Sequence, residues 1–129
     1  MKYLGIDFGG ARIGTAVSDS GGRIAFPKKI LLNQNNPRLG DQIKSLISEE
    51  KISEIVIGLP LALDQKETEE SGEVRKFVGW LKSITAIPLV FENEVFTTRM
   101  TKHEGVLKSK ADAASAAIIL QSYLDKINK

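Results

Sequence analysis

The sequence predicts an α/β protein built around one mixed β-sheet. Three strand patterns joined by short turns open the chain, and consecutive strands of this kind form an antiparallel meander. Helix and strand patterns then alternate, which is typical of parallel crossover connections, and the chain ends in a helical pattern. Its 129 residues suit a single core, and no repeat or linker divides them, so we expect one domain over residues 1–129.

The first two strands are predicted as a hairpin. Residues 3–8 and 13–17 are short apolar runs separated by Gly9 and Gly10, and glycine supplies the positive φ that tight hairpin turns require. Residues 23–32 predict the third strand. Pro27 interrupts this strand, and because proline has no backbone N–H to donate, we expect an edge position or a β-bulge there.

The remaining elements follow from the spacing of their apolar residues. They are a helix over residues 37–50, a strand over 54–59, an exposed acidic loop over 61–70 that runs into a helix over 68–83, a strand over 87–91, a short helix beginning at 96–99 and a final helix over 110–126. Asn36 is expected to cap the first helix, with Pro37 at its first position.

Composition excludes several kinds of site. The chain has no cysteine, so disulfides, thiolate metal sites and catalysis by cysteine are excluded. His103 is the only histidine and cannot form a multi-histidine zinc site. The chain starts in a strand pattern without the apolar region of a signal peptide, and no apolar stretch approaches the roughly 20 residues that span a bilayer. We therefore expect a cytoplasmic protein without membrane contact.

Charge is distributed unevenly along the chain. The net charge is only +2, but residues 1–40 carry six Lys and Arg against two acids, and residues 96–129 carry six against three. Residues 41–95 carry six against eleven. If the outer segments meet in space they form a basic face of the kind that binds a phosphate backbone, although solvated surface lysines explain the same counts.

Asp7 is the most unusual residue of the first strand. It lies between Ile6 and Phe8 in a run that otherwise predicts a buried strand, where a bare carboxylate is costly. Gly9 beside it leaves room for a bulky ligand to approach the backbone. The pattern D-x-G-x-x-x-x-G-x-A therefore indicates a carboxylate that holds a metal or faces a phosphate. The alternative is that Asp7 only shapes the turn.

Two further acids lie at positions that suit a site. Glu94 directly follows the strand predicted over residues 87–91, and ligands gather at the carboxyl ends of parallel strands. An exposed loop residue is the alternative for Glu94. Asp112 lies in the first turn of the final helix, where Ser109 and Asp112 resemble a capping box, so cap and ligand both remain open. With Asp7, these acids are expected to converge at one edge of the sheet.

Four stretches in this order resemble the YqgF/RuvX family, a branch of the ribonuclease H-like fold related to RuvC-type resolvases. They are Gly5-Ile6-Asp7-Phe8-Gly9 with residues 12–19, residues 56–61, Glu94 with residues 96–98, and Asp112 with residues 116–121. Together they span nearly the whole chain and are far more specific than the first stretch alone. The resemblance implies a central five-stranded mixed sheet in the order 3-2-1-4-5, flanked by helices.

The resemblance also implies a metal-dependent nuclease whose catalytic, metal-binding residues are Asp7, Glu94 and Asp112. The family is associated with trimming the 5′ end of precursor 16S ribosomal RNA, and it was earlier proposed to resolve Holliday junctions. The expected substrate is therefore precursor ribosomal RNA. The alternative is that the protein is an endonuclease of the Holliday junction resolvase type, which cuts branched DNA.

The chemistry of phosphodiester hydrolysis suits these three acids. Two divalent ions about 3.5–4 Å apart activate the attacking water and relieve charge on the non-bridging and leaving oxygens. Hard cations such as Mg²⁺ or Mn²⁺ take oxygen ligands. We expect Asp7 to bridge two such ions, with Glu94 on one side and Asp112 on the other.

Contacts to nucleic acid are expected from residues near the acids. Arg12 lies on the turn beside Asp7, Lys108 and Lys110 precede Asp112, and Thr97 and Thr98 offer hydroxyls that can bind phosphate. With one Trp and two Tyr, recognition by shape or by a partner is expected rather than by stacked bases. The protein is expected to be a monomer or a weak homodimer, because the edge strand over residues 23–32 can pair or stay alone.

One departure from the family pattern concerns the residues around Glu94. The family's Asp-Glu-Arg-x-Thr-Thr reads Asn93-Glu94-Val95-Phe96-Thr97-Thr98 here. If the missing arginine holds substrate phosphate or orients the glutamate, binding or cleavage should be weaker. A catalytically decayed module that only docks on RNA or on a partner protein therefore stays open.

An actin-like ATPase or sugar kinase is the rival class, because such proteins share the D-x-G-x-x-x-x-G hairpin on a related fold. They enclose a nucleotide between two domains of this kind. The 129 residues supply only one, which disfavours this class.

Overall fold

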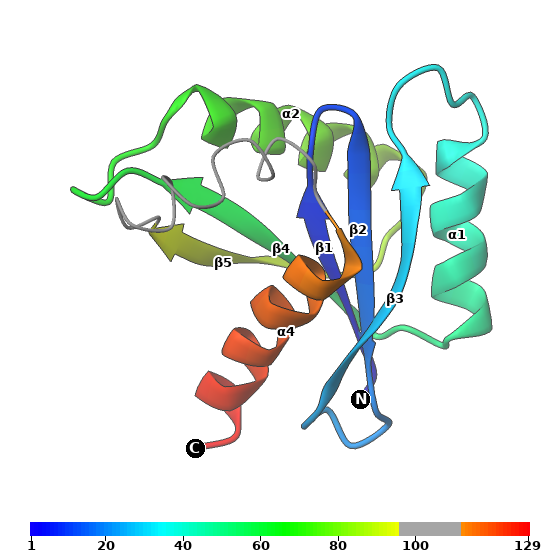
Figure 1. The fold of residues 1–129 in the computed structure, drawn as a ribbon. Coiled ribbons are helices and arrows are strands. Elements are labelled where there is room, and N and C mark those ends of the chain that lie inside the picture. Colours follow the sequence, from blue (N-terminus) through cyan, green and yellow to red (C-terminus); the bar gives the residue numbers. More distant parts are fainter. Residues whose placement is uncertain (96–111) are drawn as a thin grey trace.

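The strands of the protein form one mixed sheet in the order β3-β2-β1-β4-β5 (Figure 1). The computed structural model describes residues 1–95 and 112–129. Its strands are β1 (Tyr3–Phe8), β2 (Arg12–Ser18), β3 (Ala25–Leu32), β4 (Glu54–Leu61) and β5 (Leu89–Val95). The first three are antiparallel, and β4 and β5 run parallel to β1. The predicted meander, the crossover connections and the strand order are confirmed.

Within residues 1–95 and 112–129, three helices cover the two faces of the sheet. They are α1 (Leu39–Glu49), α2 (Glu69–Ile84) and α4 (Ala113–Ile127). Figure 1 shows α4 alone on the near face, while α1 and α2 lie on the other side. Among the described helices none has the length and apolar character needed to cross a membrane.

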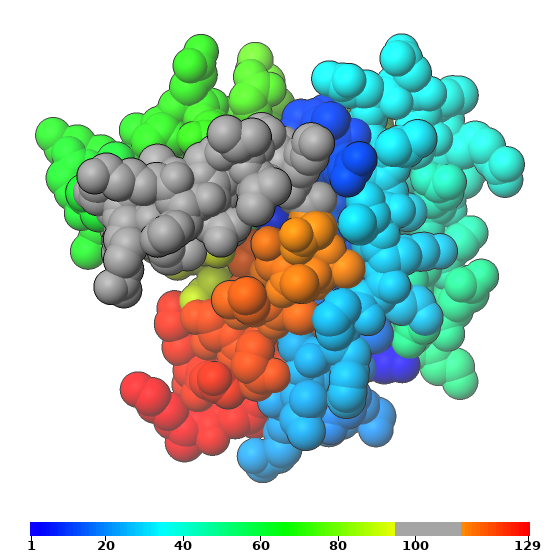
Figure 2. Space-filling view, in the orientation of Figure 1, coloured from blue at the N-terminus to red at the C-terminus, as the bar shows by residue number. Residues whose placement is uncertain are grey.

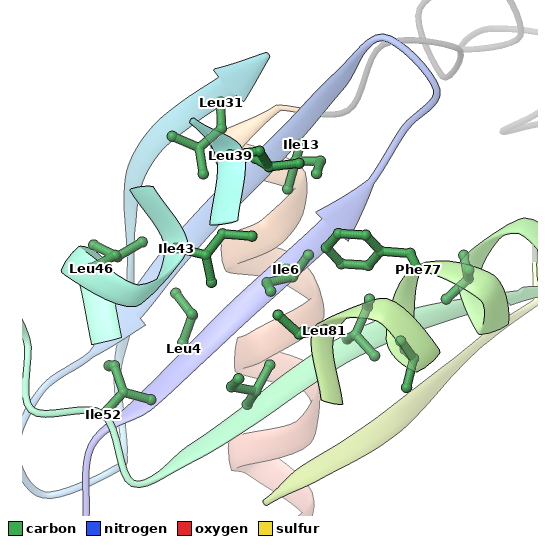
Figure 3. Close-up of a cluster of buried hydrophobic side chains, with 14 of the residues drawn as sticks. Leu4, Ile6, Ile13, Leu31, Leu39, Ile43, Leu46, Ile52, Phe77 and Leu81 are labelled. Carbon is green, nitrogen blue, oxygen red and sulfur yellow. The ribbon is translucent and has the colours of Figure 1, made fainter. Parts of the chain in front are cut away.

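The larger hydrophobic core lies between the sheet and the helices α1 and α2. Successive strand side chains point to opposite faces, so Leu4 and Ile6 of β1 face these two helices. In Figure 3 they meet Ile43 of α1 and Leu81 of α2. Each of these side chains is fully or almost fully buried, and such burial stabilises a fold by roughly 1.5–3 kcal/mol per side chain.

The second face of the sheet is built for close approach of α4. A Cβ atom at Gly5 would lie 2.8 Å from Leu120 Cβ and 3.0 Å from the Ala116 carbonyl oxygen. A side chain at position 5 would therefore displace the helix. The absence of a side chain there, together with the small side chain of Ala116, brings α4 directly onto β1.

Strand β3 lies at the edge of the sheet and carries a β-bulge. Thr15 pairs with Lys29 and Ala16 with Pro27, so Lys28 is the extra residue. Both expectations for Pro27, an edge position and a bulge, are confirmed. The Lys28 ammonium lies 2.9 Å from Glu50 at the end of α1, and Lys2 lies 2.7 Å from the same carboxyl group. These two hydrogen bonds lower the pKa of Glu50.

Two predicted local conformations are wrong. The connection between β1 and β2 pairs Phe8 with Ile13, so four residues span it, and neither Gly9 nor Gly10 has a positive φ. A four-residue connection does not need the conformation of a two-residue turn. Helix α1 begins at Leu39, because Asn36 instead forms a separate turn in which its side chain accepts from the Arg38 N–H at 3.2 Å.

Strands β4 and β5 both continue further than their apolar runs. The parallel register pairs Leu59 with Asn93 and Pro60 with Glu94 and ends at Leu61 and Val95. Asn93 and Glu94, which were expected to follow the strand in a loop, therefore belong to β5 and pair with β4. The last helix begins at Ala113 rather than at residue 110. The short helix predicted from residue 96 lies outside the described residues.

Candidate active site

Asp7 lies between two glycines near the carboxyl end of β1. Its antiparallel partner on β2 is Gly14. The parallel register that pairs Ile6 with Ile57 places Gly58 of β4 on its other side. Asp7 is half-buried and, by alternation from Gly5, lies on the face that α4 covers. Because neither neighbour has a side chain, groups from other elements can approach the sheet on both sides of Asp7.

The carboxyl group of Glu94 occupies the space over Gly58. A Cβ atom at Gly58 would lie 2.7 Å from Glu94 Oε1 and 2.8 Å from Ile119 Cδ1, so a side chain here would displace the ends of both side chains. Glu94 is half-buried and belongs to β5, which corrects the alternative of an exposed loop residue. The structure thus places Glu94 over the strand next to Asp7.

Asp112 lies over Gly14 on the opposite side of Asp7. A Cβ atom at Gly14 would lie 1.9 Å from the Asp112 carbonyl oxygen, so the backbone of Asp112 rests directly on β2. Asp112 is the N-cap of α4, and its Oδ1 accepts from the Ser115 N–H at 2.7 Å. The cap is therefore present. It uses one carboxylate oxygen and leaves the second to a separate role.

The three acids lie in a row across β2, β1 and β4, in the order Asp112, Asp7, Glu94. All three provide hard oxygen donors, which suit a divalent cation such as Mg²⁺. Within residues 1–95 and 112–129, no three acidic or histidine side chains lie close enough to form a ready-made metal cluster. Protein sites for Mg²⁺ usually supply only one or two carboxylates and complete the shell with water and substrate phosphate. The donor set fits such a site.

Glu92 positions α4 on this face and was not among the site residues predicted from the sequence. Its side chain is only 4% exposed, and its Oε2 accepts from Ser122 Oγ and from Lys126 Nζ, both at 2.7 Å. The signal was available, because the alternation from Val90 through Glu92 to Glu94 places all three residues on one face. A charge at this depth is retained because the ammonium and hydroxyl groups of α4 satisfy it.

Tyr123 makes a second anchor between α4 and the sheet. Its hydroxyl donates to Glu54 Oε1 at 2.9 Å. Burial first, and then the hydrogen bond to Glu54, raise the pKa of Tyr123 to about 12. The neutral phenol is therefore the form that the fold stabilises.

We expect Tyr123→Phe to reduce the loss of stability at high pH. The unfolded chain ionises this phenol near its ordinary pKa of about 10, before the folded chain does, so Tyr123 contributes stability below pH 10 that is lost as the pH rises through 12. The measurement is the free energy of unfolding in urea across this range. The wild type should fall more steeply than the variant, and parallel curves would contradict the assignment.

Of the five residues predicted to contact nucleic acid, only Arg12 lies within the described residues. It is exposed at the start of β2 and, two residues before Gly14, lies on the same face as Asp7. Thr97, Thr98, Lys108 and Lys110 lie outside the described residues. The two outer segments meet in the described residues, because α4 packs against β1, β2 and β3. Residues 112–129 carry two Lys against two Asp, so the basic face stays a prediction. Figure 2 shows β3 and α4 side by side.

Comparisons with known proteins agree with this architecture. The family model described as "RuvX: Holliday junction resolvase" matches residues 1–126. A relative from Sulfurihydrogenibium sp. is 40% identical over 98% of this chain and 92% of its own length. One from Anaplasma marginale is 39% identical over 96% of this chain and 84% of its own. Both are named "Putative pre-16S rRNA nuclease".

Solved structures of resolvases share the fold. The Thermus thermophilus RuvC structure aligns with a TM-score of 0.56 and 12% identity, covering 99% of this chain and 97% of that one. The fowlpox virus resolvase, solved with its Holliday junction DNA, aligns over the full length of both chains with a TM-score of 0.53 and 10% identity. At these identities the likeness concerns the fold, which is that predicted from the sequence.

Proposed function

The chain belongs to the RuvX family, as its sequence motifs predicted, and from this premise we propose that it is a metal-dependent nuclease for the 5′-end maturation of precursor 16S ribosomal RNA. The observation that carries the proposal is the row of Asp112, Asp7 and Glu94, in which Gly14 and Gly58 give the outer two acids their places. The names of the two relatives described above support the choice of RNA as substrate.

Asp7 and Glu94 would hold the divalent cation, Mg²⁺ or Mn²⁺, with Asp112 as the third acid. When bound, such ions supply an activated water and relieve charge on the phosphate oxygens during phosphodiester hydrolysis. The contribution of this chain is the placement of the oxygen donors. Gly14 and Gly58 leave the space in which Asp112 and Glu94 lie on either side of Asp7, and Glu92 binds Lys126 of α4, whose N-cap is Asp112.

Arg12 would bind the substrate backbone next to the acids. An exposed guanidinium on the face of Asp7 can contact phosphate oxygens without reading sequence. Such contacts weaken as salt rises, because binding releases counterions from the nucleic acid. Affinity that depends strongly on salt and little on sequence is therefore expected.

The test is cleavage of end-labelled precursor 16S ribosomal RNA and of a four-way DNA junction, each in Mg²⁺, Mn²⁺ or EDTA. We expect cleavage of the RNA in either metal and none in EDTA. Cleavage of the junction alone would replace the proposal with a resolvase. Binding of RNA without cleavage in any metal would favour a decayed binding module, and Val95→Arg, which restores the family's arginine, would then be the first variant to make.

A further inference from the structure

An aromatic groove lies on the face of the sheet opposite to the three acids, at the carboxyl end of β1. It is a shallow depression of about 290 Å³ that is open to solvent, and its lining includes the aromatic residues Phe8, Phe77 and Trp80. Phe8 directly follows Asp7 in β1, and successive strand side chains point to opposite faces. The groove and the row of acids therefore flank the same end of β1.

The three aromatic rings contact one another in the order Phe8, Phe77, Trp80. The centroids of Phe8 and Phe77 lie 4.8 Å apart and those of Phe77 and Trp80 lie 5.6 Å apart, with interplanar angles of 35° and 36°. Phe77 is only 7% exposed, whereas Trp80 is 39% exposed. This series of rings thus extends from the core to the partly exposed indole of Trp80, on which a further flat ring can stack.

Polar groups at the rim suit the edge of a nucleobase. Asn33, Glu73 and Lys76 line the same groove and offer an amide, a carboxylate and an ammonium. Glu73 and Lys76 form an ion pair at 3.9 Å with both side chains mostly exposed, so solvent already competes for them. Unpaired bases are recognised by this combination, in which an aromatic face stacks on the base and polar groups bind its edge.

The turn between β1 and β2 lies between the acids and the groove, and its residues Gly9 and Gly10 have no side chain. A Cβ atom at Gly10 would meet nothing within 4 Å, so the space above it is open. Asn33 Nδ2 donates to the Gly9 carbonyl at 2.8 Å and fixes the turn from the groove side. Gly10 is exposed whereas Gly9 is buried, so a polynucleotide that passes from one face to the other would cross the turn at Gly10.

From these observations we infer that the aromatic groove binds an unpaired base of the RNA substrate, on the face of β1 opposite to the row of acids. This inference rests on the proposed function and narrows its substrate to RNA that is single-stranded next to the cut. It replaces the expectation that stacked bases play little part. That expectation came from one Trp and two Tyr in the composition, whereas the groove is completed by two phenylalanines.

Trp80 is the only tryptophan of the chain, so fluorescence excited selectively in tryptophan, and not in the two tyrosines, reports on this groove. We would titrate the protein in EDTA with short single-stranded RNA and, separately, with the same sequence as a duplex. We expect saturable quenching by the single strand and little by the duplex. Absence of saturable quenching, or equal quenching by both RNAs, would overturn the inference.

Variants separate stacking from a structural role of Trp80, whose ring also packs near Gly40 of α1. Trp80→Ala should weaken binding of fluorescently labelled single-stranded RNA about 10-fold or more, and Trp80→Phe should restore most of the affinity because it keeps a ring. Leu63→Ala is the matched control, since Leu63 is a 60% exposed apolar residue outside the groove. Unchanged affinity in Trp80→Ala would overturn the inference.

The two proposals fail in different ways. Quenching by single-stranded RNA without cleavage in any metal would remove the nuclease and keep the groove. Metal-dependent RNA cleavage with the same KM in Trp80→Ala as in the wild type would keep the nuclease and remove the groove.

Discussion

Replacement of Asp7 by asparagine should lower the rate of RNA cleavage by more than about 100-fold, because loss of a direct metal ligand exceeds the 10- to 100-fold effect usual for groups that only support a ligand. Asparagine has the shape of aspartate but lacks the charge that attracts a divalent cation. The melting temperature should stay within about 4 °C of the wild type. The measurements are single-turnover cleavage in Mg²⁺ and thermal unfolding followed by circular dichroism.

Asp41→Asn is the matched control for this experiment. Asp41 is an exposed acid in the first turn of α1, so the substitution removes the same charge away from the site. It should leave cleavage unchanged. Equal cleavage by Asp7→Asn and the wild type would remove Asp7 from the catalytic residues and with it the central member of the row.

The largest effect on stability is expected for Gly14→Val. The new Cβ would lie 1.9, 2.2 and 2.9 Å from the carbonyl oxygen, the carbonyl carbon and the Cα of Asp112. All three are backbone atoms, so no rotamer change relieves the clash and the start of α4 has to move. We expect a loss of about 3 kcal/mol, the upper part of the usual range for overpacking, and a melting temperature lower by at least about 10 °C.

Gly10→Ala is the control for Gly14→Val, because position 10 is open and has no positive φ. Its free energy of unfolding should match the wild type or exceed it slightly, since alanine restricts the unfolded chain more than glycine does. Urea unfolding of both variants gives the comparison. A Gly14→Val protein as stable as the wild type would contradict the close packing of Asp112 on β2.

Features of the fold that depend on neighbouring residues were predictable from the sequence. The meander follows from short apolar runs, and Pro27 marks the edge strand and its bulge because the missing N–H acts locally. The strand order came from the family resemblance, since pairing of β1 with β4 joins segments that no local pattern connects. The start of α1 was misplaced because Asn36 serves a turn as well as it would serve a cap.

The candidate site was predictable in its acids and not in their surroundings. Asp7 is conspicuous in an apolar strand, but the roles of Gly14 and Gly58 depend on which atoms approach them from other elements. Glu94 was assigned to a loop because a charged residue after an apolar run usually indicates the end of a strand. The pairing of β5 with β4, which extends the strand past Glu94, is not visible in the sequence. The aromatic groove was missed for the same reason, since it joins Phe8 to residues of α2.

The packing of α4 on β1 has a consequence for synthesis of the protein. Residues 113–127 cover Gly5, at the centre of the sheet, and the segment that begins with Asp112 completes the row of acids. A nascent chain that ends before residue 112 can form the local β1–β2–β3 meander, but the face that α4 covers remains exposed to solvent. Asp112 and α4 join the sheet only after residues 112–127 have left the ribosome, so under the proposed assignment a shorter nascent chain lacks one of the three acids.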